Sequence, residues 1–114
     1  MHPLIPRLRQ ARIIPVVRAS TAARAATAVA WLQQAGLTVF EITMTVPEAP
    51  ALIRALSADP ALLVGAGTVP DAATAQACLE AGARFIVAPW VDATLAAPVQ
   101  EAGACLMLGA LTPT

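Results

Sequence analysis

The chain has 114 residues, of which 58% are hydrophobic and 12% are charged. This composition excludes a disordered chain and predicts extensive burial within one domain. Seven basic and seven acidic residues cancel, and with no Lys/Arg cluster the sequence shows no electrostatic footprint for nucleic acid. The longest uncharged run, residues 25–40, is broken by two glutamines and a glycine and is short for a membrane span. Because residues 1–10 lack the pattern of a secretory signal, we expect a cytoplasmic protein.

The first third of the chain predicts a short lead, a strand and a helix. Residues 1–11 have amphipathic character. The apolar run at residues 12–18 predicts a strand buried on both faces. Because proline cannot donate to a ladder, Pro15 requires this strand to lie near a sheet edge or to be irregular there. A helix is expected from about residue 21 to residue 35, with Ser20 or Thr21 as its N-cap and a glycine after its end.

The stretch at residues 37–45 places one carboxylate, Glu41, inside an apolar and β-branched run. Such a run favours a strand, and side-chain alternation puts Val39, Glu41 and Thr43 on one face with Phe40 and Ile42 on the other. A carboxylate is costly to bury unless something requires it. Glu41 is therefore either a catalytic group or a member of a structural ion pair or helix cap.

The rest of the chain repeats the alternation. A helix is expected after Val46, with Pro47 in its first turn, and it ends at Asp59. Further strands are expected at residues 61–64, 84–88 and 104–108, and further helices at about residues 70–81 and 92–102. Pro98 conflicts with an unbroken final helix, because proline kinks or shortens a helix interior.

The repeating unit of strand, loop, helix and Ala-Gly predicts parallel strands joined by right-handed helical crossovers. We expect an α/β fold made of the first five β units of a (β/α)8 TIM barrel, forming a single partial domain over residues 1–114 that is truncated after the fifth strand. An open doubly wound sheet is the alternative.

In a barrel the chemistry gathers at the carboxyl ends of the strands. The polar and distinctive residues expected there are Arg18, Glu41, Thr43, Thr45, the run Gly65–Thr68, Pro89, Trp90 and Thr112. One cation, one carboxylate, several hydroxyls and a glycine-rich turn suit a small anionic substrate that needs one proton moved. The alternatives are structural: Arg18 solvating a strand end, Thr68 capping a helix and Trp90 packing.

No cofactor or metal is expected. The single histidine lies near the terminus, and Cys78 and Cys105 are expected to be buried free thiols. The run Gly65–Thr68 matches half of a dinucleotide fingerprint but lacks its third glycine.

Four motifs in this order and spacing resemble the 2-keto-3-deoxy-6-phosphogluconate (KDPG) and 4-hydroxy-2-oxoglutarate (KHG) aldolases. They are Glu-Ile-Thr-Met-Thr at 41–45, Val-Gly-Ala-Gly-Thr-Val at 64–69, Phe-Ile-Val-Ala-Pro at 85–89 and Gly-Ala-Leu-Thr-Pro-Thr at 109–114. The resemblance implies a class I aldolase, usually a homotrimeric barrel, that splits KDPG into pyruvate and glyceraldehyde 3-phosphate through a lysine Schiff base.

The resemblance also implies roles for individual residues. Glu41 matches the general acid/base, and Thr68 matches a threonine that holds the pyruvate carboxylate. Gly67 and Pro89 belong to the matching substrate-binding motifs. Some members carry an arginine where this chain has Thr45, and Arg18 is the candidate to replace it.

The 114-residue sequence contains no lysine. Because an amine nucleophile is needed to form an iminium with a ketone, we expect this chain to be inactive alone. The sequence therefore predicts part of an aldolase. The alternative is a non-catalytic half-barrel that self-associates or binds a complementing partner.

Overall fold

The structure is a computed structural model that describes residues 1–113. Its elements in chain order are α1 (Ile5–Ala11), β1 (Val16–Val17), α2 (Ala22–Gln34), β2 (Val39–Thr43), α3 (Ala49–Ser57), β3 (Leu63–Gly67), α4 (Ala72–Glu80), β4 (Phe85–Ala88), the 3-10 turn η1 (Ala93–Leu95), α5 (Ala96–Glu101) and β5 (Cys105–Leu108). The expected alternation of strands and helices is confirmed.

The five strands form one parallel sheet in the order β1-β2-β3-β4-β5. Each strand lies beside the next one in the chain, without the reversal of order that defines a doubly wound sheet. Glu41 of β2 lies level with Val16 of β1 and with Gly65 of β3. Residues that lie level on neighbouring parallel strands point to the same face of the sheet. The side chains of Val16 and Glu41 and the open side of Gly65 therefore share one face.

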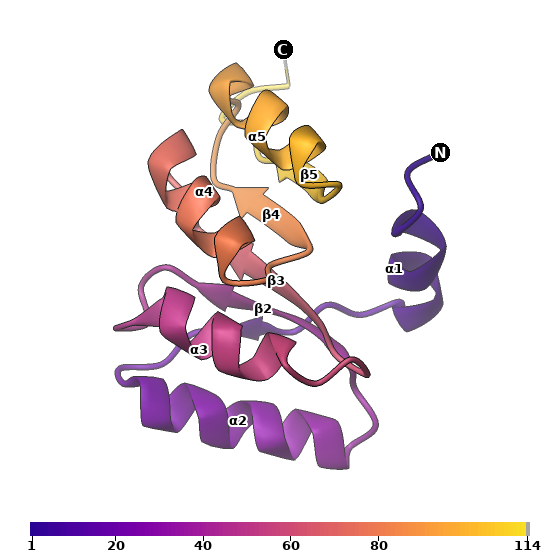
Figure 1. The fold of residues 1–114 in the computed structure, drawn as a ribbon, viewed down its shortest axis with the longest axis vertical. Helices are drawn as coiled ribbons and strands as arrows, with labels where there is room; N and C mark the ends of the chain where they lie inside the picture. Colours follow the sequence, from indigo (N-terminus) through magenta and orange to yellow (C-terminus); the bar gives the residue numbers. More distant parts are fainter. Residues whose placement is uncertain (114) are drawn as a thin grey trace.

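The sheet is covered on its two faces by different helices (Figure 1). Helices α2 to α5 pack on the outer face, where they bury Phe40, Ile42 and Ile86. Helix α1 lies on the inner face, where Leu4 and Leu8 meet a group from four strands: Val39, Leu63, Phe85 and Cys105. The split of Val39 from Phe40 and Ile42 confirms the alternation predicted for β2.

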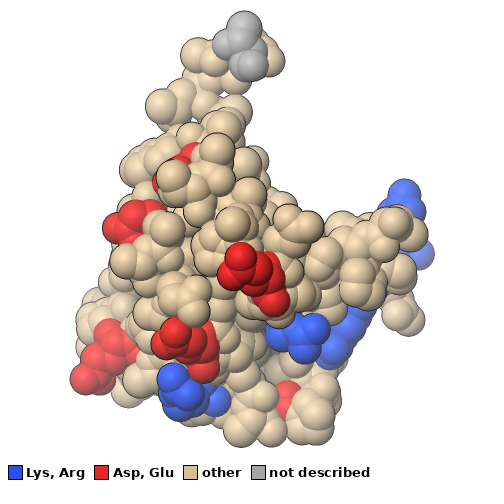
Figure 2. Space-filling view, turned by 45° about the horizontal axis from the view of Figure 1, so that its top comes forward, with Lys and Arg blue, Asp and Glu red and all other residues tan. Residues whose placement is uncertain are grey.

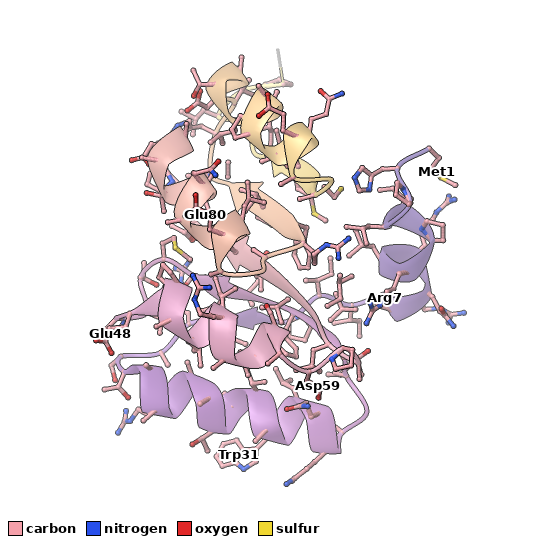
Figure 3. The ribbon with its side chains drawn as sticks, in the orientation of Figure 1. Met1, Arg7, Trp31, Glu48, Asp59 and Glu80 are labelled. Atoms are coloured by element: carbon pink, nitrogen blue, oxygen red, sulfur yellow. The ribbon has the colours of Figure 1, made fainter. Side chains whose placement is uncertain are left out.

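Helix α1 is also tied to the rest of the chain by a polar contact. Nη2 of Arg7 donates a hydrogen bond of 2.8 Å to the carbonyl of Ala61, in the turn that follows α3. Figure 3 shows Arg7 on α1, and Trp31 projecting from α2 on the side away from the sheet. This contact holds α1 against the turn that precedes β3.

Several element boundaries differ from the sequence predictions. The strand expected at 12–18 is reduced to Val16–Val17, and Val16 is 58% exposed rather than buried because β1 is an edge strand. The carbonyl of Pro15, just before β1, accepts a hydrogen bond from the Glu41 amide. Since β1 is the first strand of the sheet in the described residues, the prediction of an edge position is confirmed. The prediction that Pro47 opens the next helix is wrong, since that helix begins at Ala49 with Pro50 in its first turn.

One further correction concerns residues 61–67. The third strand is Leu63–Gly67, so the glycines expected in its exit turn lie within the strand and are buried. The conflict predicted for Pro98 is confirmed, because the helix expected at about 92–102 is shortened to α5 after the 3-10 turn η1, with Pro98 in the first turn of α5.

Cys78 and Cys105 are buried free thiols, as predicted. None of the helices in residues 1–113 has the length and hydropathy needed to cross a bilayer. Figure 2 shows the charged side chains of one face as small separate groups in a mostly uncharged surface.

Candidate functional site

The candidate site is centred on Glu41, near the carboxyl end of β2. Its β-branched and aromatic neighbours favour a strand, and the strand directs Glu41 to the inner face of the sheet. The side chain is only 8% exposed. Glu41 and Thr43 are the buried polar or charged residues among those described, so the site is the main polar feature of an otherwise apolar interior.

The Glu41 carboxylate leans across to the neighbouring strand and lies over Gly67. A Cβ atom built on Gly67 would overlap Oε1 of Glu41 and would lie 2.8 Å from its Cδ. The carboxylate therefore occupies the space that any other residue at position 67 would fill with its own side chain.

Burial and a nearby cation act on Glu41 in opposite directions. Removal from water is the larger effect and raises the pKa of the carboxyl group, because burial penalises the charged form. The positive charge of Arg18 lowers the same pKa by a smaller amount. The balance favours a carboxyl group that retains its proton at higher pH than a solvated glutamate.

Arg18 and Thr68 meet beside this carboxylate. Arg18 follows β1 and Thr68 follows β3, and Nη2 of Arg18 donates a hydrogen bond of 3.0 Å to Oγ1 of Thr68. Thr68 has a φ of 55°, a left-handed conformation that is unusual for a β-branched residue. Residues in such conformations often occur at functional sites. The alternative in which Thr68 caps a helix is wrong, because Asp71 caps α4 by accepting from the Thr74 amide.

Two threonine hydroxyls complete the carboxyl end of β2. Oγ1 of Thr43 and Oγ1 of Thr45 lie 2.7 Å apart in a hydrogen bond. Thr43 is fully buried, whereas Thr45 is exposed. Thr45 therefore offers a hydroxyl group and no charge. By the resemblance described above, some KDPG and KHG aldolases have an arginine at this position.

The structure brings Glu41, Arg18, Gly67 and Thr68 together, and Pro89 directly follows β4, the strand that pairs with β3. Pro89 is exposed at the exit of β4, where its neighbour is Gly109 after β5. Trp90 follows it and is 43% exposed, so it is not a core packing residue.

The contact between Glu41 and Gly67 is the feature that sequence reasoning missed. The sequence indicated a carboxylate on one strand and a glycine on the next. The contact could have been predicted from Gly67 itself, because a glycine inside a buried strand, two residues after Gly65, indicates that another group approaches the backbone closely.

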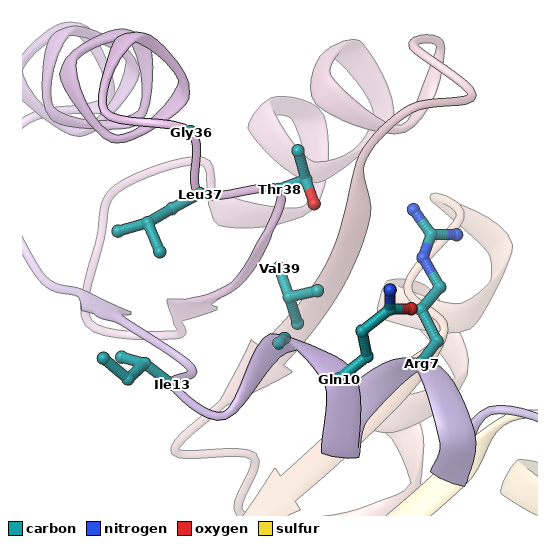
Figure 4. A pocket seen from close by; sticks show the side chains of 8 residues that line it. Arg7, Gln10, Ile13, Gly36, Leu37, Thr38 and Val39 are labelled. Carbon is teal, nitrogen blue, oxygen red and sulfur yellow. The ribbon is translucent and has the colours of Figure 1, made fainter.

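The described residues contain no group of three or more His, Cys, Asp or Glu side chains that could hold a metal ion. A hollow of about 340 Å³ lies at the opposite, amino end of β2, between α1 and residues 36–39 (Figure 4). It is lined by Arg7, Gln10 and Ile13 among others and includes none of the strand-end residues.

A family model described as KDPG and KHG aldolase matches residues 4–114. The chain belongs to this aldolase family. The 2-dehydro-3-deoxy-phosphogluconate aldolase of Pseudomonas aeruginosa is 42% identical over 82 residues, which are 71% of this chain and 37% of that protein. The enzyme of the same name from Zymomonas mobilis is 33% identical over 102 residues, which are 90% of this chain and 49% of that protein.

Solved structures of the family share the fold. The KDPG aldolase of Zymomonas mobilis with 3-phosphoglycerate superposes with a TM-score of 0.80 at 32% identity, covering 93% of this chain and 51% of that one. The Legionella pneumophila KDPG aldolase, with pyruvate captured as a covalent carbinolamine, gives a TM-score of 0.76 at 29% identity over 87% of this chain and 48% of that one. The five strands are thus the first five β units of a TIM-barrel-type aldolase, and the chain spans about half of the length of these structures.

Proposed function

We propose that this chain supplies the amino-terminal part of a class I aldolase site that cleaves KDPG to pyruvate and glyceraldehyde 3-phosphate. The observation that carries the proposal is the buried Glu41 carboxylate beside the Arg18–Thr68 pair, in a chain of the aldolase family. The same part of the fold in a relative belongs to an enzyme that captures pyruvate as a carbinolamine.

Glu41 is proposed as the general acid/base. When an amine adds to a ketone, the carbinolamine must lose its hydroxyl as water before the iminium forms, and a positioned acid protonates that hydroxyl. The resulting carboxylate then accepts the proton of the substrate hydroxyl next to the carbon–carbon bond that breaks. A carboxyl group whose pKa is raised by burial suits both steps, because it keeps its proton to higher pH than a solvated glutamate and can also release it.

Arg18 and Thr68 are proposed to bind the carboxylate of the keto acid. The guanidinium supplies charge-assisted hydrogen bonds, and the Thr68 hydroxyl, already held by Arg18, supplies a further polar contact. Gly67 and Pro89 are proposed to line the same small anionic substrate from β3 and β4.

The Schiff-base lysine has to come from outside these 114 residues, which contain none. The proposal therefore includes inactivity of the isolated chain, and completion of the site by further barrel units in a cytoplasmic, trimeric assembly like that expected for the family. The competing function is a non-catalytic half-barrel that binds a partner.

A fusion tests the proposal. Residues 1–114 replace the matching half of the Zymomonas mobilis aldolase, whose remaining half is retained, and the fusion is treated with pyruvate and borohydride. We expect a reduced pyruvate adduct and release of pyruvate from KDPG. The isolated 114-residue chain is expected to give no adduct on a side chain, and peptide mapping identifies any adduct on the α-amino group of Met1.

Glu41→Gln in the same fusion is the matched variant, because the amide keeps the size of the side chain and removes its proton transfer. We expect the cleavage rate to fall by about 10²–10⁴-fold. A fusion with native secondary structure and unfolding cooperativity that traps no pyruvate would support the non-catalytic half-barrel instead.

A further inference from the structure

Gly67 lies in a place where a strand usually avoids glycine. It is the last residue of β3, is buried, and pairs with Thr43 of β2. The glycines with positive φ are Gly36, Gly82 and Gly103, so the backbone at Gly67 does not itself require glycine. A glycine in a buried strand that has no conformational reason indicates that another group approaches the backbone closely.

The group that approaches is different for each of the two glycines of β3. A Cβ on Gly65 would overlap the ring of Phe85, which comes from β4 on one side. A Cβ on Gly67 would overlap the carboxylate of Glu41, which comes from β2 on the other side. The inner face of β3 therefore has two hollows, one filled by an apolar ring and one filled by a carboxylate.

We infer that Gly67 is a positioning residue for Glu41: its missing side chain forms the hollow that holds the carboxylate against β3. This inference rests on the proposed acid/base role of Glu41 and adds a residue that acts through it. Burial of the side chain, to which this position contributes, raises the pKa of Glu41, and the charge of Arg18 lowers it.

An alanine at position 67 has a definite consequence. The β3 backbone is hydrogen-bonded on one side to β2 and on the other to the β4 segment, so it cannot retreat easily. The atom that meets the new methyl group is the far end of a flexible side chain. Glu41 therefore yields, and its carboxylate moves out of the hollow toward water. In Gly65→Ala, by contrast, the obstructing ring is a fully buried part of the inner core and cannot yield.

The test is a titration of the Glu41 carboxyl carbon by NMR in the 114-residue chain and in Gly67→Ala. We expect the titration midpoint to fall in the variant, because the carboxylate regains hydration. Gly103→Ala is the control for destabilisation alone: its φ of 67° strains any side chain, but a methyl group there meets nothing within 4 Å, so we expect lower stability and an unchanged Glu41 midpoint. A midpoint that stays the same or rises in Gly67→Ala overturns the inference.

A second variant covers the case in which Gly67→Ala does not fold. Glu41→Ala removes the obstructing carboxylate, so the double variant Glu41→Ala/Gly67→Ala is expected to recover cooperative unfolding. Failure of the double variant to recover while Glu41→Ala alone folds would overturn the inference.

The aldolase fusion supplies a functional readout. Gly67→Ala is expected to lower kcat about tenfold or more with a smaller change in KM, and to shift the acid limb of the pH profile downward. A rise in KM at constant kcat would leave Gly67 only its proposed place beside the substrate and would overturn its role in positioning Glu41. Because the titration needs no catalysis, its result stands even if the fusion shows that the proposed function is wrong.

Discussion

A single carboxylate, Glu41, is the proposed acid/base and is buried inside the chain. Its side chain is held in a hollow on β3, and burial there outweighs the attraction of Arg18 in setting its pKa. A buried acid of this kind is usually unfavourable for folding at neutral pH, because the folded state resists its ionisation. The site thus has a cost in stability that can be measured separately from activity.

Glu41→Gln is expected to remove that cost. An unfolded glutamate ionises near 4.5, and the folded-state pKa of Glu41 lies above this value. The folded state binds more protons between the two values, so the parent loses stability as the pH rises from below 4.5 through the folded-state pKa. The variant lacks this loss, so its free energy of unfolding should rise relative to that of the parent as the pH rises. Urea unfolding at several pH values measures this difference.

Glu101→Gln is the control for this comparison, because Glu101 is exposed on α5 away from the site. It should follow the pH dependence of the parent. A Glu41→Gln curve parallel to that of the parent would contradict the buried position of the carboxyl group.

The sequence indicated much of the site but not its central contact. Glu41, Arg18 and Thr68 were expected at strand ends, because parallel strands bring their carboxyl ends to one edge. The seating of Glu41 over Gly67 depends on side-chain directions across two strands, which no local pattern encodes. Thr68 likewise gave no local sign of its left-handed backbone, because threonine rarely adopts it.

At the scale of elements, α1 is the part that differs most from its neighbours. It packs on the inner face of the sheet, whereas the four later helices pack on the outer face. Leu8 is the buried residue of α1, and it packs against the strands beside Leu4, the residue just before the helix. The helix has only seven residues and no side-chain cap at its start, so its stability depends on this packing.

Leu8→Ala is expected to destabilise the chain by about 2 kcal/mol, because it removes buried apolar contact and leaves a cavity against the sheet. Gln10→Ala on the exposed side of the same helix should change the free energy of unfolding by less than about 0.5 kcal/mol. Urea unfolding of the two variants provides the measurement. Equal effects would mean that α1 is not packed on the sheet.

The type and order of the elements could be predicted, whereas some of their boundaries could not. Short apolar runs indicated the strands, and the recurring Ala-Gly pairs indicated where helices end. The prediction for residues 12–18 overestimated the first strand, because a hydrophobic run does not show how many of its residues pair with the next strand. Pro47 and Pro50 fit a first helical turn equally well, and only the left-handed backbone at Glu48 selects the later start.

At the scale of the whole molecule, the outer strands have exposed apolar side chains. Val16 of β1 is 58% exposed and Leu108 of β5 is 42% exposed. In the described part of the chain each of these strands pairs on one side only. Unpaired strand edges with apolar side chains promote association with other chains.

Val16→Lys is therefore expected to weaken self-association of the isolated chain by about tenfold or more, because a lysine on an edge strand opposes edge-to-edge pairing. Sedimentation velocity over a range of concentrations measures this. Ala30→Lys, exposed on α2, adds the same charge away from the edge and should change association much less. Equal effects of the two variants would show that net charge, and not the edge, controls association.

The sequential order of the sheet also bears on how the molecule is made. Every strand pairs with the next one along the chain, as Val16 does with Glu41 and Phe85 with Cys105, so its pairings connect positions about 20–25 apart. Short loops between contacting residues close with little entropic cost and favour rapid folding. Each new unit can therefore dock on the one before it while the polypeptide is still leaving the ribosome. Growth of the sheet then follows the direction of synthesis, and the strands that carry Arg18, Glu41 and Thr68 assemble first.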